Sequence, residues 1–188
     1  MNVFEALVSR HTAKTYGQTA PTPEHVQAVL ESAVRAPDHG RLRPWRFLLI
    51  EGSQREKLAD ILVASAKRRC PGLPESDLQR ERGKALRAPM IIVVACRIVK
   101  GTKIPDIEQI LAAGAATQNM LLALHGLGYS AAWKTGEAAY DPEVKTALGL
   151  APNDHIVALV YTGGGEGATF APGKPASVAD AMLKFPDA

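Results

Sequence analysis

Residues 89–96 are a proline, six apolar residues and a cysteine, without one charged side chain. A continuous apolar run of this length is typical of a strand that is buried on both faces of its sheet. Helical segments separate this strand from the other expected strands. We therefore predict an α/β or α+β protein in which three layers are built around a small central sheet.

Hydrophobic periodicity and capping residues predict the other elements. Strands are expected at 46–51, 129–133 and 155–161, and helices at 2–9, 23–35, 54–68, 107–125 and 141–148, with a charged helix from residue 75 onward. The middle of the longest helix, 111–116, is apolar and small all round. This composition indicates a central helix, a subunit interface, or both.

Two segments have a weaker pattern. Residues 70–88 contain Pro71, Gly72 and Pro74, and we interpret them as a surface excursion, with a mobile cover over a site as the alternative. Residues 164–188 read as a C-terminal extension of a single domain that spans 1–188. This extension cannot form a core alone, so it is expected to pack on the body or on a partner subunit.

The 188 residues favour one domain, and the formal net charge of +3 is mild. Such a charge favours a local anion site over a general polyanion surface, so no nucleic-acid partner is expected. Cys70 and Cys96 lie in different contexts, a polar loop and an apolar strand, which argues against a disulfide. Neither a signal peptide nor an apolar run of ~18 residues is evident. A cytoplasmic protein without a membrane partner is expected.

The usual catalytic motifs are absent from the sequence. The five histidines have no metal-ligand spacing, so no metal site is predicted. No Gly-x-Ser-x-Gly motif is found, and the glycine-rich stretch 163–167 lacks the ending of a phosphate loop. No dinucleotide fingerprint follows the first strand. A nucleotide would have to be held in another way.

Phosphate-binding side chains occur instead at the ends of several elements: Arg10, His11, Thr12 and Lys14; Arg35 and His39; Lys134 and Thr135. Arg, Lys and Thr supply the charge-assisted donors that a phosphate requires. The loop 35–47 is stiffened by Pro37 and Pro44, because proline fixes φ and restricts the residue before it. Taken singly, each of these side chains is better explained as a solvated surface charge, and the loop 35–47 is equally compatible with a solvated basic loop that has Trp45 in the core.

Four motifs in order carry a resemblance to the nitroreductase family of FMN-dependent oxidoreductases, in particular to its short single-domain bacterial branch. They are Ser9-Arg10-His11-Thr12, Arg35-Ala36-Pro37-Asp38-His39 leading to Arg43-Pro44-Trp45-Arg46-Phe47, Glu108-Gln109 at the start of the helix that ends at Gly126-Leu127-Gly128, and Trp133-Lys134-Thr135-Gly136. The resemblance covers about residues 2–163.

This resemblance implies an α+β fold with a mostly antiparallel sheet, in an intertwined homodimer that binds FMN at the subunit interface. It implies FMN contacts from Arg10, His11, Thr12, Trp133, Lys134 and Thr135 of one subunit and from Arg35 and His39 of its partner. It also assigns NADH or NADPH binding to Ala123, Leu124, His125, Gly126, Leu127 and Gly128. The tail is expected to embrace the partner.

The activity that the resemblance implies is ping-pong transfer of hydride from NAD(P)H, through flavin N5, to a nitroaromatic, a quinone or a similar small-molecule acceptor. No side-chain acid or base is obligatory for such chemistry. The sequence departs from the family pattern at His11, Arg43 and Lys134, where Arg, Gln and Arg are common. Two alternatives stay open: flavin cleavage or dehalogenation on the same fold, and a non-enzymatic anion-binding protein.

Overall fold

A computed structural model describes residues 1–164 and 177–183, and its centre is a four-stranded sheet. The strands are β1 (Trp45–Glu51), β2 (Met90–Cys96), β3 (Tyr129–Lys134) and β4 (His155–Gly164), in the spatial order β1-β2-β4-β3. Every neighbouring pair is antiparallel. The predicted α+β class with a small antiparallel sheet is confirmed.

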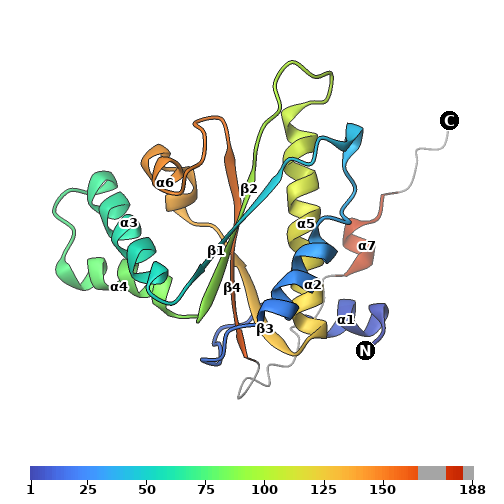
Figure 1. Cartoon of the computed structure of the whole chain (residues 1–188), viewed down its shortest axis with the longest axis horizontal. Coiled ribbons are helices and arrows are strands. Elements are labelled where there is room, and N and C mark those ends of the chain that lie inside the picture. The colour runs from blue at the N-terminus through green and yellow to red at the C-terminus, as the bar shows by residue number, and fades with distance from the viewer. Residues whose placement is uncertain (165–176, 184–188) are drawn as a thin grey trace.

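Strand β2 is the centre of the core, as its apolar run predicted, and all seven of its residues are buried. Because side chains alternate across a strand, Ile92 and Val94 belong to one hydrophobic cluster and Ile91 and Val93 to another. The first cluster includes residues of α2 (Pro23–Ala33) and α5 (Asp106–Gly126); the second includes residues of α3 (Gln54–Arg69), α4 (Glu75–Leu86) and α6 (Pro142–Ala147). Figure 1 shows these helix groups on opposite sides of the sheet, which confirms the three layers.

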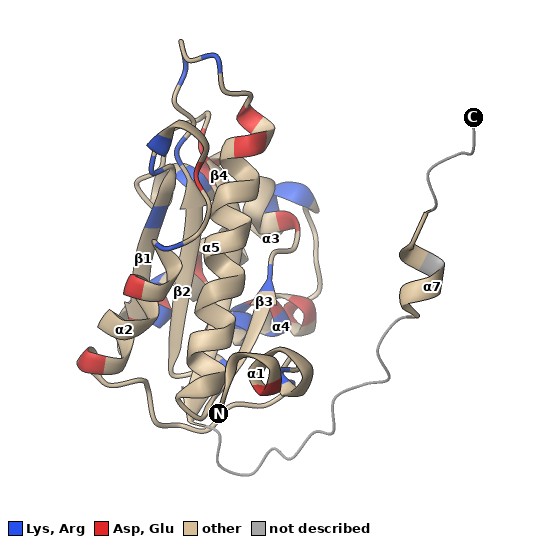
Figure 2. Cartoon of the chain, turned by 90° about the vertical axis from the view of Figure 1, so that its right-hand side faces the viewer, with Lys and Arg blue, Asp and Glu red and all other residues tan. Residues whose placement is uncertain are grey.

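Helix α5 is the longest helix of the described chain, with 21 residues. Its first turn is fixed by Gln109, whose buried amide accepts from Val99 N (2.8 Å) and donates to Val99 O (3.2 Å) and Ile104 O (3.3 Å). Its opposite face is open in the single chain, where Ile107 and Leu111 are 58% and 63% exposed. No charged residue occurs between Glu108 and the end of this helix, and Figure 2 shows its middle free of charge. The exposed face of α5 is therefore suited to pack against another apolar surface.

Helix α1 (Val3–Ser9) begins at a capping box, in which Asn2 and Glu5 satisfy each other's backbone N–H groups. The predicted apolar face forms, but none of the residues of α1 is buried, and Phe4 and Val8 are 76% and 75% exposed. An amphipathic pattern indicates that one face of a helix will be covered, but it does not identify the surface that covers it. Within residues 1–164 and 177–183 this face of α1 stays uncovered.

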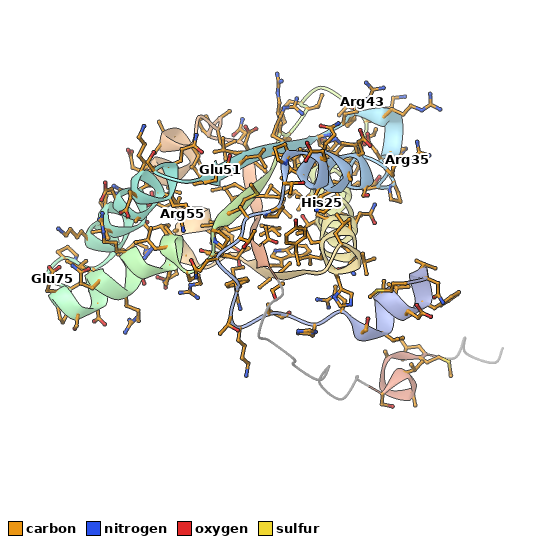
Figure 3. The ribbon with its side chains drawn as sticks, turned by 60° about the horizontal axis from the view of Figure 1, so that its bottom comes forward. His25, Arg35, Arg43, Glu51, Arg55 and Glu75 are labelled. Carbon is orange, nitrogen blue, oxygen red and sulfur yellow. The ribbon has the colours of Figure 1, made fainter. Side chains whose placement is uncertain are left out.

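The loop 35–47 is as stiff as its prolines predicted. It contains a short 3-10 turn, η1 (His39–Arg41), and the Asp38 carboxylate accepts a hydrogen bond from Arg43 N at 2.7 Å. Arg41 and Arg43 both have positive φ, at 55° and 48°, a conformation that costs energy for residues with a side chain. Trp45 is buried as the first residue of β1, whereas Arg35 and Arg43 extend outward (Figure 3).

The remaining predictions have mixed outcomes. Helix α4 packs on α3, where Arg82 bonds to Asp60 (2.5 Å) and Glu56 (3.0 Å), so residues 75–86 form part of the helical layer rather than a mobile cover. The proposed packing of the C-terminal extension falls largely outside the described residues; a short helix, α7 (Val178–Ala181), is described within it. In the described part of the chain, no helix is long and apolar enough to cross a membrane.

Candidate functional site

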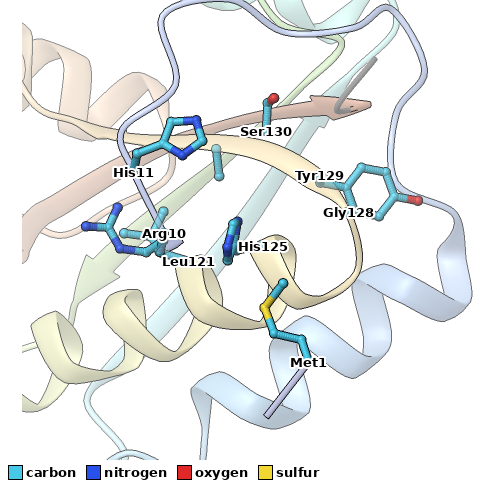
Figure 4. Close-up of a pocket in the computed structure, with 9 residues that line it drawn as sticks. Met1, Arg10, His11, Leu121, His125, Gly128, Tyr129 and Ser130 are labelled. Carbon is cyan, nitrogen blue, oxygen red and sulfur yellow. The ribbon is translucent and has the colours of Figure 1, made fainter. Parts of the chain in front are cut away.

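A cavity of about 270 Å³ lies beside the C-terminal end of α5 (Figure 4). It is formed by the segment that follows α1, the last turns of α5 and the beginning of β3. Its lining residues are Met1, Arg10, His11, Leu121, His125, Gly128, Tyr129, Ser130 and Ala131. Ligand pockets usually have volumes of ~300–1,000 Å³, so this cavity is the size of part of a site.

Backbone hydrogen bonds place the Arg10–Thr12 segment at the edge of the sheet. After α1 the chain becomes extended at Arg10, and Ala13 N donates to Ala131 O of β3 at 3.0 Å. Farther along, Gly17 N donates to Gly164 O at 2.7 Å. The segment is thus attached to strands that are more than a hundred residues distant in the sequence.

His125 in the last turn of α5 faces this segment. Its Nε2 lies 2.7 Å from Ser9 Oγ, and its ring meets the His11 ring edge-on, with centroids 6.3 Å apart. Burial lowers the pKa of His125, and the positive charges of His11 and Arg10 lower it further. The imidazole is therefore neutral at neutral pH, and Arg10 supplies a permanent positive charge beside it.

The end of β3 supplies the second group of predicted FMN residues. Trp133 donates from Nε1 to Val157 O at 3.0 Å, and its ring lies against α5 at Gly114, where a Cβ would be 3.7 Å from Cη2. Lys134 and Thr135 are exposed. Thr135 lines a different cavity, of about 200 Å³, which includes residues of α3 and α4. One chain therefore does not place Thr135 in the cavity of Arg10 and His11.

His39 lies at the opposite end of α5, and Arg35 precedes it in the loop that follows α2. His39 Nδ1 is 2.5 Å from the Glu108 carboxylate, in the first turn of the helix, whereas His125 is in the last turn. Because a helix rises 1.5 Å per residue, Glu108 and His125 are about 25 Å apart. Within one chain, His39 and Arg10 therefore lie near opposite ends of α5.

The predicted nicotinamide segment is only partly accessible. Leu124 is fully buried and Ala123 packs on the same core cluster, whereas Gly126, Leu127 and Gly128 are exposed. The structure adds Ser9 and Tyr129 to the site: Ser9 stood in the first motif without a predicted contact, and the sequence offered no signal for Tyr129 beyond its position at the start of a predicted strand.

Other catalytic groups do not assemble in the described residues. Within 1–164 and 177–183, no three His, Cys, Asp or Glu side chains gather as metal ligands. Burial raises the pKa of the Cys96 thiol to about 11, so it is not a thiolate nucleophile at neutral pH.

Solved structures with the same architecture identify the class. A nitroreductase-like family protein from Bacillus cereus has a TM-score of 0.83 at 24% identity, and the match covers 100% of this chain and 97% of that one. A Desulfovibrio desulfuricans protein, described as a nitroreductase in complex with FMN, has a TM-score of 0.76 at 27% identity, covering 100% and 99%. The fold is that of the nitroreductase-like α+β oxidoreductases.

The sequence comparison is more specific. A protein named as an NAD(P)H nitroreductase, YdjA of Escherichia coli K12, is 34% identical over 163 residues, which cover 87% of this chain and 88% of the relative. A Haemophilus influenzae protein with the same type of name is 34% identical over 166 residues, covering 88% and 89%. The profile of the Nitroreductase family matches residues 7–164. The chain belongs to the nitroreductase family and is an enzyme of the oxidoreductase class.

Proposed function

We propose that this protein is an FMN-dependent oxidoreductase that takes hydride from NADH or NADPH and delivers it to a nitroaromatic, a quinone or a similar electron-poor acceptor. The observation that carries the proposal is the cationic half-site at Arg10 and His11 in a chain of this family. The FMN-bound Desulfovibrio structure and the names of the relatives support the cofactor and the electron donor.

The donor set fits the phosphate of FMN. Arg10 offers a guanidinium at the cavity, and Thr12 lies in the same segment. Lys134 follows on β3, about 10 Å from the Ala131 contact at a strand rise of ~3.3 Å per residue. A phosphate group between these elements would receive charge-assisted hydrogen bonds from both. When bound, FMN supplies the hydride chemistry; the protein binds it, orients it and excludes water.

We infer that the complete site needs two chains. The exposed stripe of α5 contains Ile107 and Leu111 and continues along small and apolar residues, without charge. A two-fold axis across this stripe would pack the helices antiparallel, because a two-fold interface joins the same patch on both chains. The N-terminal end of one α5, with Arg35 and His39, would then lie near the partner's Arg10 segment.

Chemistry centred on the flavin needs no obligatory side-chain acid, base or nucleophile. The hydride donor NADH or NADPH and the electron acceptor would bind one after the other at the same place beside the flavin, as the ping-pong scheme requires. The exposed residues 126–128 are the part of the predicted nicotinamide segment that is open to a dinucleotide. Trp133, 37% exposed at the α5 face, is placed to border the same region.

The absorbance spectrum of the purified protein is the first test. Yellow protein with the flavin bands, bleached anaerobically by NADH or NADPH, is the expected result. Colourless protein that also ignores added FMN would refute the proposal.

The variants Arg10→Ala and Lys134→Ala test the phosphate assignment. Hydrogen bonds to charged groups contribute ~1.5–3 kcal/mol, so each variant should weaken FMN binding by roughly 10- to 100-fold. Flavin fluorescence during titration of the FMN-free protein measures this affinity. Lys67→Ala, at an exposed position of α3, is the matched control and should bind FMN as the wild type does. Wild-type affinity in both site variants would show that the phosphate lies elsewhere.

A further inference from the structure

Helix α1 is attached to the body of the chain chiefly through its last residue. None of its residues is buried, and Asn2 and Glu5 bond to each other. Ser9 differs, since its Oγ lies 2.6 Å from Glu5 O within the helix and 2.7 Å from His125 Nε2 across to α5. Ser9 is therefore a junction between α1 and the C-terminal end of α5.

The directions of these two hydrogen bonds follow from the chemistry of the groups. Glu5 O can only accept, so the Ser9 hydroxyl must donate its single proton to it. The hydroxyl oxygen then accepts from His125, which requires a proton on Nε2. The geometry thus indicates one tautomer of neutral His125, with the hydrogen on Nε2 and the lone pair on Nδ1.

Residues 10–12 are held at both ends, and the junction at Ser9 is the first of the two anchors. Ser9 holds the segment at its beginning, and the hydrogen bond from Ala13 N to Ala131 O holds it at its end. Arg10, His11 and Thr12 lie between these anchors. A loop that is fixed at both ends presents its donors with less loss of conformational entropy on binding.

We propose that His125 is a positioning residue for the anion-binding segment. Its Nε2–H group holds Ser9, and through Ser9 it sets the conformation in which Arg10 and Thr12 receive the FMN phosphate. Contact with the nicotinamide dinucleotide is not its role. The inference rests on the proposed function only for the identity of the ligand; the anchoring of α1 by His125 stands on the geometry alone.

The surroundings of His125 agree with this role. Arg10 and His11 face it from the segment after α1, and Tyr129 lines the same cavity from β3, with its hydroxyl 2.8 Å from His25 Nδ1. Acidic groups are absent from the described lining of this cavity. A neutral imidazole holds Ser9 without adding positive charge to the cavity.

The test compares His125→Ala, Ser9→Ala, the double variant and His125→Gln in the full-length protein. Loss of one hydrogen bond should weaken FMN binding by roughly 3- to 10-fold, with little change in KM for NADH or NADPH at saturating FMN. The double variant should be no worse than Ser9→Ala, because Ser9→Ala already removes the bond that His125→Ala removes. Glutamine keeps an N–H donor at a similar reach and should restore affinity. His155→Ala, at an exposed position of β4, is the control.

Amide hydrogen exchange in the FMN-free protein gives a readout that needs no cofactor. Residues 3–13 should exchange faster in His125→Ala and Ser9→Ala, and at the wild-type rate in His125→Gln and His155→Ala. A raised KM for the dinucleotide with unchanged FMN affinity and unchanged exchange would overturn the proposal. So would a glutamine variant as weak as the alanine one. If wild-type protein binds no FMN, the proposed function is refuted. The hydrogen-exchange comparison then still tests whether His125 anchors α1 through Ser9.

Discussion

Leu111 is the residue that most directly tests the two-chain site. It is 63% exposed on the uncharged stripe of α5. Full burial of a leucine side chain is worth ~1.5–3 kcal/mol, so covering the exposed part contributes about 1–2 kcal/mol per copy. A two-fold interface contains two copies, which gives ~2–4 kcal/mol. Leu111→Ala should therefore weaken dimerisation by roughly 30- to 1,000-fold.

Sedimentation velocity over a dilution series measures the dimerisation constant, and absorbance at the flavin bands measures FMN in the same samples. Because the proposed cofactor site draws residues from both chains, FMN content should fall together with the dimer fraction. Leu48→Ala is the matched control, since Leu48 is 39% exposed on the edge strand β1, away from the stripe.

An unchanged dimerisation constant in Leu111→Ala would refute the assignment of this face. A monomeric variant that keeps its FMN would refute the dependence of the cofactor site on two chains. The unfolding of the single chain should be little affected in either case, because Leu111 is mostly exposed within it.

Three further predictions are checked by urea unfolding. The pKa of His125 is lowered from 6.5 in the folded chain, so the imidazole is protonated at a higher pH in the unfolded chain than in the folded one. The free energy of unfolding should therefore fall as the pH drops below about 6.5. The fall should be smaller in His125→Gln. Gly163→Ala should cost ~1–3 kcal/mol because the new Cβ would lie 2.4 Å from Gly17 O, whereas Gly126→Ala, with no atom within 4 Å, should be nearly neutral. Thr162→Val should stabilise by ~1 kcal/mol, because the buried Thr162 hydroxyl has no hydrogen-bond partner among the described residues.

Each of these predictions has a distinct contrary result. An equal pH response in wild type and His125→Gln would show that this imidazole does not titrate differently in the folded state. A neutral Gly163→Ala would mean that the contact between the two glycine backbones relaxes without cost. A destabilised Thr162→Val would show that the hydroxyl is satisfied.

Most of the elements were predictable because their signals are local. The strand 89–96, the caps at Thr22 and Asp141, and the long helix from about residue 107 appear where expected. The strand order β1-β2-β4-β3 was not predictable, since strand pairing joins segments far apart in the sequence. The charged helix after residue 75 formed as predicted, but its packing on α3, with Leu78 and Ala85 buried and Arg82 paired to Glu56 and Asp60, joins segments far apart in the sequence and was not predictable.

The site was predictable in its residue types but not in its grouping. Arg10 and His11 line the cavity that the anion-binding hypothesis required. Ser9 opened the first motif without a role of its own and Tyr129 belonged to none, and their places beside His125 and in the cavity come from the structure. His125 was assigned to the dinucleotide, and nothing in the sequence indicated that its Nε2 would lie 2.7 Å from Ser9 Oγ.

The amino-acid sequence by itself determined the layers, the buried central strand and the chemistry of the anion donors. These properties depend on the spacing of apolar residues and on side-chain type, and both can be read from the sequence directly. Only the tertiary structure decided that His39 and His125 mark opposite ends of one helix, that Thr135 lies in a separate cavity, and that the apolar faces of α1 and α5 stay uncovered. Those facts depend on distances through space, which the period of a sequence does not contain.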